Sequence, residues 1–94
     1  MIQTICVCGA GTMGSGIAQT AAQAGFHTIL YELNGDVLTK AKENIEKNLQ
    51  LLTGKKKIAE GEKEKIMQRI SFTRDIHHCL ADIIIEAIIE KTDA

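Results

Sequence analysis

Residues 5–18, ICVCGAGTMGSGIA, constrain the fold more than any other part of the chain. A short apolar run is followed by glycines in the spacing G-x-G-x-x-G, and small residues continue after them. The apolar run has no polar alternation, which is typical of a parallel strand covered on both faces. The stretch therefore predicts a buried strand, a tight glycine turn and a closely packed helix.

Each glycine of this turn has its own physical task. Gly9 permits the tight turn, Gly11 lets backbone N–H groups approach a pyrophosphate, and Gly14 lets the helix lie close against the strand. The phosphates would lie at the helix N-terminus, where unpaired N–H groups favour an anion. The glycines alone are weak evidence, because the pattern also needs a second strand followed by an acidic residue.

Both features follow in the sequence. Gly25 ends the first helix, and residues 28–31 are rich in β-forming side chains that predict a second strand. Glu32 comes 21 residues after Gly11, which matches the acid that hydrogen-bonds an adenosine ribose about 20 residues after the turn. A carboxylate repels a 2′-phosphate, which favours NAD over NADP. The alternative is a solvated glutamate at a strand end.

The remaining residues predict an α/β fold. Residues 36–54 show the apolar spacing of a long amphipathic helix, and a shorter helix ends near residue 69. Residues 70–73 and 83–90 predict a third and a fourth strand. Strands that alternate with helices imply right-handed crossovers. We expect a doubly wound parallel sheet of the Rossmann type, truncated to about four strands in the order 3-2-1-4, with a helical arm after strand two.

In that topology the ligand crevice lies between strands one and four, where the strand order reverses. Residues at the carboxyl end of strand four should face the same crevice as the glycine turn, and we therefore expect Ala87 and Glu90 to be cofactor contacts. Glu86 could be paired, buried or functional, and the sequence does not decide among these roles.

Composition limits the class of protein. The 94 residues allow one domain, spanning 1–94, and a net charge of −1 argues against a nucleic-acid partner. No apolar run approaches the roughly 18 residues of a membrane span, and no targeting leader is evident. Three cysteines do not form a disulfide framework, which favours the cytoplasm.

The motifs GAGTMGSGIAQTAAQAG, ISFTRD and IIIEAIIE, with the acid after strand two, carry a family resemblance. Together they resemble the NAD-binding domain of the 3-hydroxyacyl-CoA dehydrogenases, including the 3-hydroxybutyryl-CoA enzymes, over essentially the whole chain. The resemblance implies oxidation of (S)-3-hydroxyacyl-CoA to 3-oxoacyl-CoA in fatty-acid or butanoate metabolism. It also implies NAD as cofactor and an acyl-CoA as the substrate of the full enzyme.

The resemblance assigns roles residue by residue. Glu32 would hold the ribose, where the family more often has Asp, and Ala87 and Glu90 would line the nicotinamide side. Lys55 matches a lysine that contacts the CoA phosphates, although a run of lysines is more often a solvated surface. The pyrophosphate would be held by the turn residues Gly9, Ala10, Gly11, Thr12, Met13 and Gly14.

The family's catalytic His–Glu pair lies beyond the fourth strand, and a separate C-terminal helical domain encloses the acyl chain. Neither region is in this sequence, and His27, His77 and His78 do not match the catalytic position. We therefore expect no catalytic residue in this chain, which would be the cofactor half of a dehydrogenase. The start at Met1 favours a monofunctional enzyme. The alternatives are a stand-alone, non-catalytic NAD-binding or interaction module and a fragment.

The cysteines and histidines raise the possibility of two metal sites, and the sequence favours neither. Alternation along a strand puts Cys6 and Cys8 on one face, where buried packing is favoured over a metal site. A cluster of His77, His78, Cys79 and Asp82 is also disfavoured, because no spaced partners accompany it. We expect no metal. An exposed edge on strand four predicts a homo-oligomer.

Overall fold

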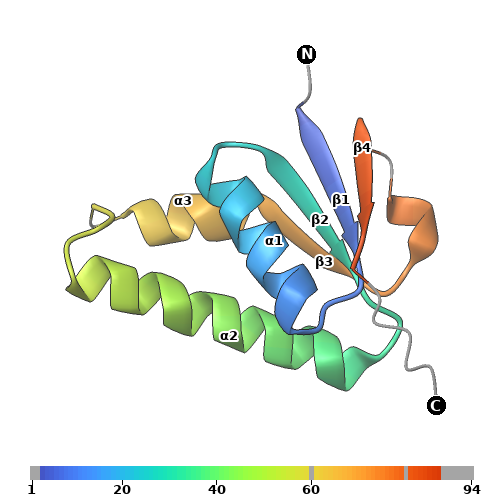
Figure 1. The fold of residues 1–94 in the computed structure, drawn as a ribbon, viewed down its shortest axis with the longest axis horizontal. Helices are drawn as coiled ribbons and strands as arrows, with labels where there is room; N and C mark the ends of the chain where they lie inside the picture. The colour runs from blue at the N-terminus through green and yellow to red at the C-terminus, as the bar shows by residue number, and fades with distance from the viewer. Residues whose placement is uncertain (1–2, 60, 80, 88–94) are drawn as a thin grey trace.

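The computed structural model describes residues 3–59, 61–79 and 81–87. Strands and helices alternate along most of the chain (Figure 1). In order, the elements are β1 (Thr4–Cys8), α1 (Thr12–Gln23), β2 (His27–Tyr31), α2 (Gly35–Gly54), α3 (Glu62–Gln68), β3 (Ile70–Thr73), the 3-10 turn η1 (Ile76–His78) and β4 (Ile83–Glu86).

The four strands form one parallel sheet in the order β3-β2-β1-β4, which confirms the predicted order (Figure 1). In the register of the sheet, Cys8 at the end of β1 lies between Tyr31 of β2 and Glu86 of β4. The carboxyl ends of these three strands therefore meet at one edge, where the glycine turn also begins.

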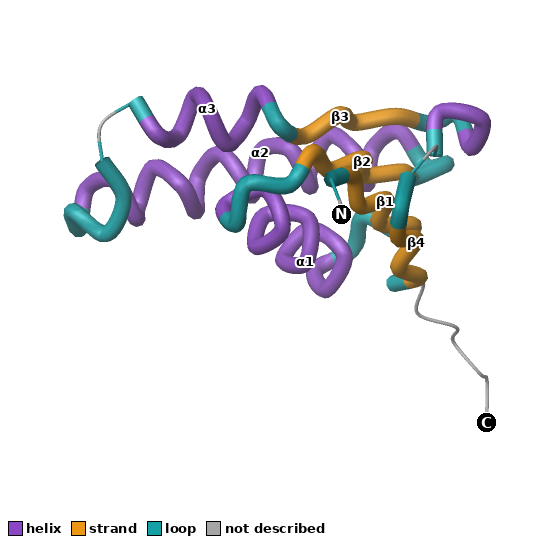
Figure 2. Tube along the Cα trace, turned by 90° about the horizontal axis from the view of Figure 1, so that it is seen from above, coloured by secondary structure: helices purple, strands orange, loops and turns teal. Residues whose placement is uncertain are grey.

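The two faces of the sheet are covered differently. The helices α1, α2 and α3 contact one another on one side, and η1 lies on the other side (Figure 2). Val7 packs in the core on the helical side. Because successive side chains of a strand point to opposite faces, Cys6 and Cys8 face the side of η1.

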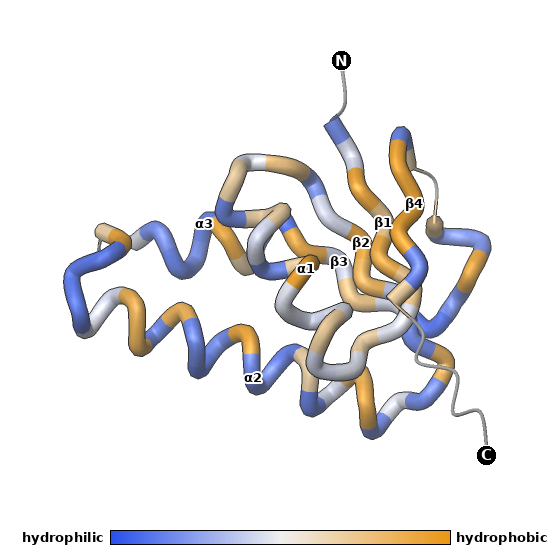
Figure 3. The backbone as a smooth tube through the Cα atoms, viewed as in Figure 1, coloured by the Kyte–Doolittle hydropathy of each residue, from blue (hydrophilic) through white to orange (hydrophobic). Residues whose placement is uncertain are grey.

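The long helix α2 is amphipathic as predicted. Hydrophobic and hydrophilic residues alternate in short stretches along it (Figure 3), and Ala41, Ile45 and Leu49 are buried against the core. Its opposite face carries lysine and glutamate, which is the pattern of a helix on a protein surface. None of the described helices is both long enough and apolar enough to cross a membrane.

Local signals in the sequence explain where the helices begin and end. The side chain of Asn34 accepts hydrogen bonds from the N–H groups of Asp36 and Val37 at 2.9 and 3.2 Å, which caps α2. Gly25 has a φ of +101°, and this left-handed residue follows α1 as predicted. The helix α1 begins at Thr12, inside the G-x-G-x-x-G turn, so that Gly14 lies within its first turn.

Candidate functional site

The glycine turn is held against the end of the neighbouring strand. The N–H of Gly9 donates to the carbonyl of Tyr31 at 2.8 Å, and Gly9 has a φ of +104°. This conformation costs glycine little and strains other residues. The turn thus leaves β1 sharply and directs the chain into α1, as the sequence predicts.

Gly14 lies against the backbone of the same turn. A Cβ atom placed on Gly14 would lie 1.7 Å from the carbonyl oxygen of Gly9 and 3.4 Å from Cβ of Ala87. A contact of 1.7 Å with a backbone atom cannot be relieved by moving a side chain. The close approach predicted for this glycine is therefore present.

Gly11, unlike Gly14, has free space where a side chain would be. A Cβ atom on Gly11 would meet no protein atom within 4 Å, and its φ of −68° and ψ of −169° suit any residue. Neither packing nor backbone conformation within the described chain requires glycine here. The missing side chain leaves open space beside the turn, as expected where a ligand approaches the backbone.

The N-terminus of α1 is open to an anion. Among the described residues, no side chain caps it and its first turn holds no acidic residue. The hydroxyl of Ser15 donates inward to the carbonyls of Ala10 and Gly11 at 3.0 and 2.8 Å. The first N–H groups of the helix and the positive end of its dipole therefore favour a phosphate.

Glu32 connects the turn to the start of α2. Its Oε1 accepts from the N–H of Ala10 and its Oε2 from the N–H of Asn34, both at 3.0 Å. Each carboxylate oxygen can accept more than one hydrogen bond, which leaves capacity for ribose hydroxyls. The sequence predicted the ribose contact but not these two backbone contacts.

These groups surround a cleft of about 420 Å³ at the carboxyl edge of the sheet. Ala87 is buried there, and its N–H donates to the carbonyl of Cys8 at 2.8 Å. The structure thus brings Ala87 to the turn, whereas Glu90 lies outside the described residues. The cleft is lined by Gly9, Gly11, Tyr31, Glu32, Leu33, Val37 and Ala87.

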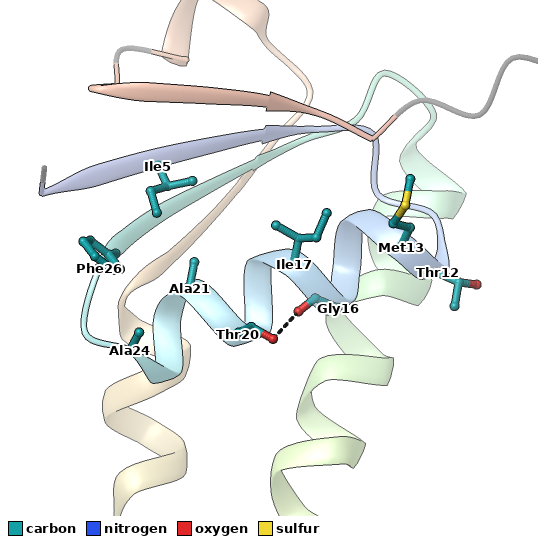
Figure 4. Close-up of a pocket in the computed structure, with 9 residues that line it drawn as sticks. All are labelled: Ile5, Thr12, Met13, Gly16, Ile17, Thr20, Ala21, Ala24 and Phe26. Atoms are coloured by element: carbon teal, nitrogen blue, oxygen red, sulfur yellow. Dashed lines mark hydrogen bonds between the residues drawn. The ribbon is translucent and has the colours of Figure 1, made fainter.

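A larger groove of about 580 Å³ lies between α1 and the sheet, where Ile17 and Ala21 of α1 point toward Ile5 of β1 (Figure 4). Its lining is largely apolar and includes Ile5, Ile17 and Phe26, and the hydroxyl of Thr20 is already bonded to the carbonyl of Gly16 at 2.9 Å. A groove with so few free polar groups does not match a charged dinucleotide. The smaller cleft, where the carboxylate and the helix N-terminus converge, fits a dinucleotide better.

Other predicted residues lie apart from the cleft. Lys55 is exposed at the end of α2, about 30 Å along this helix of 20 residues from its start beside Glu32. The CoA contact of Lys55 stays a prediction. Glu86 is exposed, and His77 and His78 are exposed on η1.

The sequence also missed a thiol cluster, formed by Cys6, Cys8 and Cys79, whose sulfur atoms lie within 4.8 Å of one another. Burial raises the pKa of Cys6, and the neighbouring thiols of Cys79 and Cys8 raise it further. Burial also raises the pKa of Cys8. The sequence suggested two separate cysteine features, and the structure joins them.

The parallel sheet, the glycine turn and the acid at the end of β2 define a dinucleotide-binding domain of the Rossmann class. Residues 4–94 match the family model of the 3-hydroxyacyl-CoA dehydrogenase NAD-binding domain. The chain belongs to this family, and its cofactor is NAD.

Relatives support the same assignment. The chain is 42% identical to a probable 3-hydroxybutyryl-CoA dehydrogenase of Bacillus subtilis over 99% of this chain and 33% of that protein. It is 37% identical to the mitochondrial hydroxyacyl-coenzyme A dehydrogenase of Sus scrofa, over 97% and 31%. A crystal structure of 3-hydroxybutyryl-CoA dehydrogenase from Escherichia coli superposes with a TM-score of 0.91 at 36% identity, over 97% and 20%. The chain thus spans a third or less of these relatives.

Proposed function

We propose that the chain is the NAD-binding part of an enzyme that oxidises (S)-3-hydroxyacyl-CoA to 3-oxoacyl-CoA. The observation that carries the proposal is the meeting of Glu32 with the glycine turn, through the hydrogen bond of 3.0 Å to Ala10, beside an uncapped helix N-terminus. Family membership supplies the class of reaction.

The residues of the cleft fit the parts of NAD. The first N–H groups of α1 would hold the pyrophosphate, and the open space at Gly11 would admit it. Glu32 would accept hydrogen bonds from the adenosine ribose hydroxyls. Ala87 would line the nicotinamide side of the cleft, and we propose the same role for Glu90. Bound NAD supplies the hydride acceptor for alcohol oxidation.

The described residues of the cleft do not include a histidine that could accept the hydroxyl proton. Oxidation of a hydroxyl needs a base within hydrogen-bond reach of its proton, and none of the three histidines lines the cleft. We propose that the base and the acyl pocket come from sequence beyond this chain, as the greater length of the relatives suggests. The chain alone would then bind NAD without catalysing hydride transfer.

Surface residues and cysteines support further parts of the proposal, namely the CoA contact, the cellular location and the oligomeric state. Lys55, exposed beyond α2, would contact a CoA phosphate in the full enzyme. Three free cysteines fit the reducing conditions of the cytoplasm. Exposed apolar side chains on β4 favour a homo-oligomer.

The direct test is calorimetry of the 94-residue chain with NADH, paired with an assay of NADH oxidation by a short 3-oxoacyl-CoA. Binding without turnover supports a cofactor-binding part, and addition of the missing domain of a relative should restore turnover. Absence of heat at millimolar NADH would contradict the proposal. Binding that is never followed by turnover, in any complemented form, would favour the stand-alone module instead.

A further inference from the structure

The thiol cluster combines two distant parts of the chain. Cys6 and Cys8 alternate along β1 on the face away from the helical core, and Cys79 directly follows η1 on that same side of the sheet. Asp82, three residues after Cys79, is anchored beside β1, because its Oδ2 accepts from the N–H groups of Gln3 and Thr4 at 2.9 and 3.0 Å. The three sulfur atoms are thus held together by the sheet and by this anchor.

The spacing of the sulfur atoms is close to that of a metal site. In a tetrahedral zinc site with Zn–S bonds of about 2.3 Å, ligand sulfurs lie about 3.8 Å apart. The thiols here lie within 4.8 Å of one another. The separations between the thiol sulfurs therefore exceed the zinc-site value by at most about 1 Å.

The setting of the cluster gives an ion access to sulfur ligands that are otherwise shielded from water. Cys6 is 0% exposed and Cys8 is 7% exposed, whereas Cys79 is partly exposed and offers a path of entry. Buried cysteines often serve only as small apolar side chains. Simple packing, however, does not require three thiols from two segments to converge, and soft thiolate ligands select ions such as Zn²⁺, Cd²⁺ and Cu⁺.

We propose that Cys6, Cys8 and Cys79 form a binding site for one thiophilic divalent cation of the zinc group. Each thiol releases its proton to solvent as its sulfur bonds the ion, and a water molecule completes the fourth position. The site is separate from the cofactor cleft, yet Cys8 precedes Gly9 and its carbonyl accepts from Ala87. An ion on Cys8 would therefore stiffen the strand ends that carry the cofactor turn.

The test uses the full 94-residue chain, reduced with a phosphine and freed of metal. Cd²⁺ is titrated while the thiolate-to-cadmium absorption in the ultraviolet is recorded, and native mass spectrometry gives the stoichiometry. One ion per chain with a saturating band is the expected result. Absence of the band, or binding of several ions without a sharp end point, would overturn the proposal.

Matched variants separate the cluster from surface binding. Cys79→Ser should weaken Cd²⁺ binding by more than about 100-fold, because loss of an outer-shell partner alone costs about 10- to 100-fold. The double variant His77→Ala, His78→Ala should bind as the unaltered chain does. Circular dichroism confirms that each variant is folded, and Cys6→Ser serves as a second test. If Cys79→Ser bound Cd²⁺ as tightly as the unaltered chain, the proposal would be overturned. Loss of Cd²⁺ binding in the double histidine variant would also overturn it.

Discussion

The backbone N–H of Ala10 donates a hydrogen bond of 3.0 Å to Oε1 of Glu32, which ties the glycine turn to the end of β2. The carboxylate that the sequence assigns to a ribose therefore also positions the turn that would hold the pyrophosphate. Because Oε2 accepts from Asn34 at the start of α2, one side chain links three elements around the cleft.

Replacing Glu32 with Ala should therefore lower both cofactor affinity and stability. Loss of charge-assisted hydrogen bonds should reduce the free energy of unfolding by about 1–3 kcal/mol. NADH affinity should fall more than NADPH affinity, because the variant also loses the repulsion of a 2′-phosphate. Calorimetry with both cofactors and urea unfolding measure these effects.

Glu32→Gln is the matched control. Its amide keeps one oxygen acceptor of the same length, so stability should fall less than in Glu32→Ala while the preference for NADH still declines. Unchanged NADH affinity in both variants would show that Glu32 does not bind the ribose.

The glycines at positions 14 and 16 should respond differently to alanine. Gly14→Ala places a Cβ at 1.7 Å from the Gly9 carbonyl oxygen, and we expect a loss of about 3 kcal/mol or more, at or above the usual range for overpacking. Gly16→Ala in the same helix meets no atom within 4 Å and should stabilise by about 0.5–1 kcal/mol. Urea unfolding compares the two, and equal stabilities would contradict the close approach at Gly14.

Gly11→Ala tests the ligand site itself. The new methyl group meets no protein atom, and the helix-capping position costs about 1 kcal/mol at most. NADH affinity should nevertheless fall about tenfold or more, because the methyl group holds the phosphate away from N–H groups whose charged hydrogen bonds contribute about 1.5–3 kcal/mol. Calorimetry on the folded variant measures the NADH affinity. An affinity equal to that of the unaltered chain would show that the phosphates do not lie beside Gly11.

Short-range signals explain why so much of the fold was predictable. The turn conformation of Gly9, the helix end at Gly25 and the cap at Asn34 each depend on a few neighbouring residues. Strand order then follows from the alternation of strands and helices. The run of apolar residues after Ile83 predicts a strand over 83–90, and β4 covers Ile83–Glu86, whereas residues 88–90 of the expected strand lie outside the described residues.

Long-range contacts were not predictable in the same way. The bond from Ala10 to Glu32 depends on the pairing register of β1 and β2, and a ribose contact was the only role that spacing suggested. Alternation put Cys6 and Cys8 on one face, but the approach of Cys79 depends on where η1 lies after β3. No local pattern specifies that position.

Asp82 should make stability depend on pH. The N–H groups of Gln3 and Thr4 hold the pKa of its carboxyl below the ordinary value. A pKa that is lower in the folded chain adds stability above the unfolded pKa of about 3.9, and this stability is lost as pH falls through the folded value. Asp82→Asn should therefore be less stable at pH 7 and should lose less stability on acidification.

Urea unfolding at neutral pH and at several acid pH values measures this dependence. Glu43→Gln, which alters an exposed carboxylate of α2, is the matched control and should keep the acid dependence of the unaltered chain. Parallel pH profiles for the unaltered chain and Asp82→Asn would show that the two backbone contacts add no stability.

The edge strand β4 should mediate self-association. Ile84 is 56% exposed and Ile83 is 37% exposed, and within the described residues β4 pairs only with β1. An apolar edge strand offers unpaired backbone groups to another chain, and a lysine on the edge is a natural means of preventing such pairing. We expect the unaltered chain to form a dimer or larger species in light scattering and Ile84→Lys to be monomeric. Thr39→Lys, on exposed α2, controls for added charge and should associate normally. A monodisperse monomer for the unaltered chain would contradict the homo-oligomer.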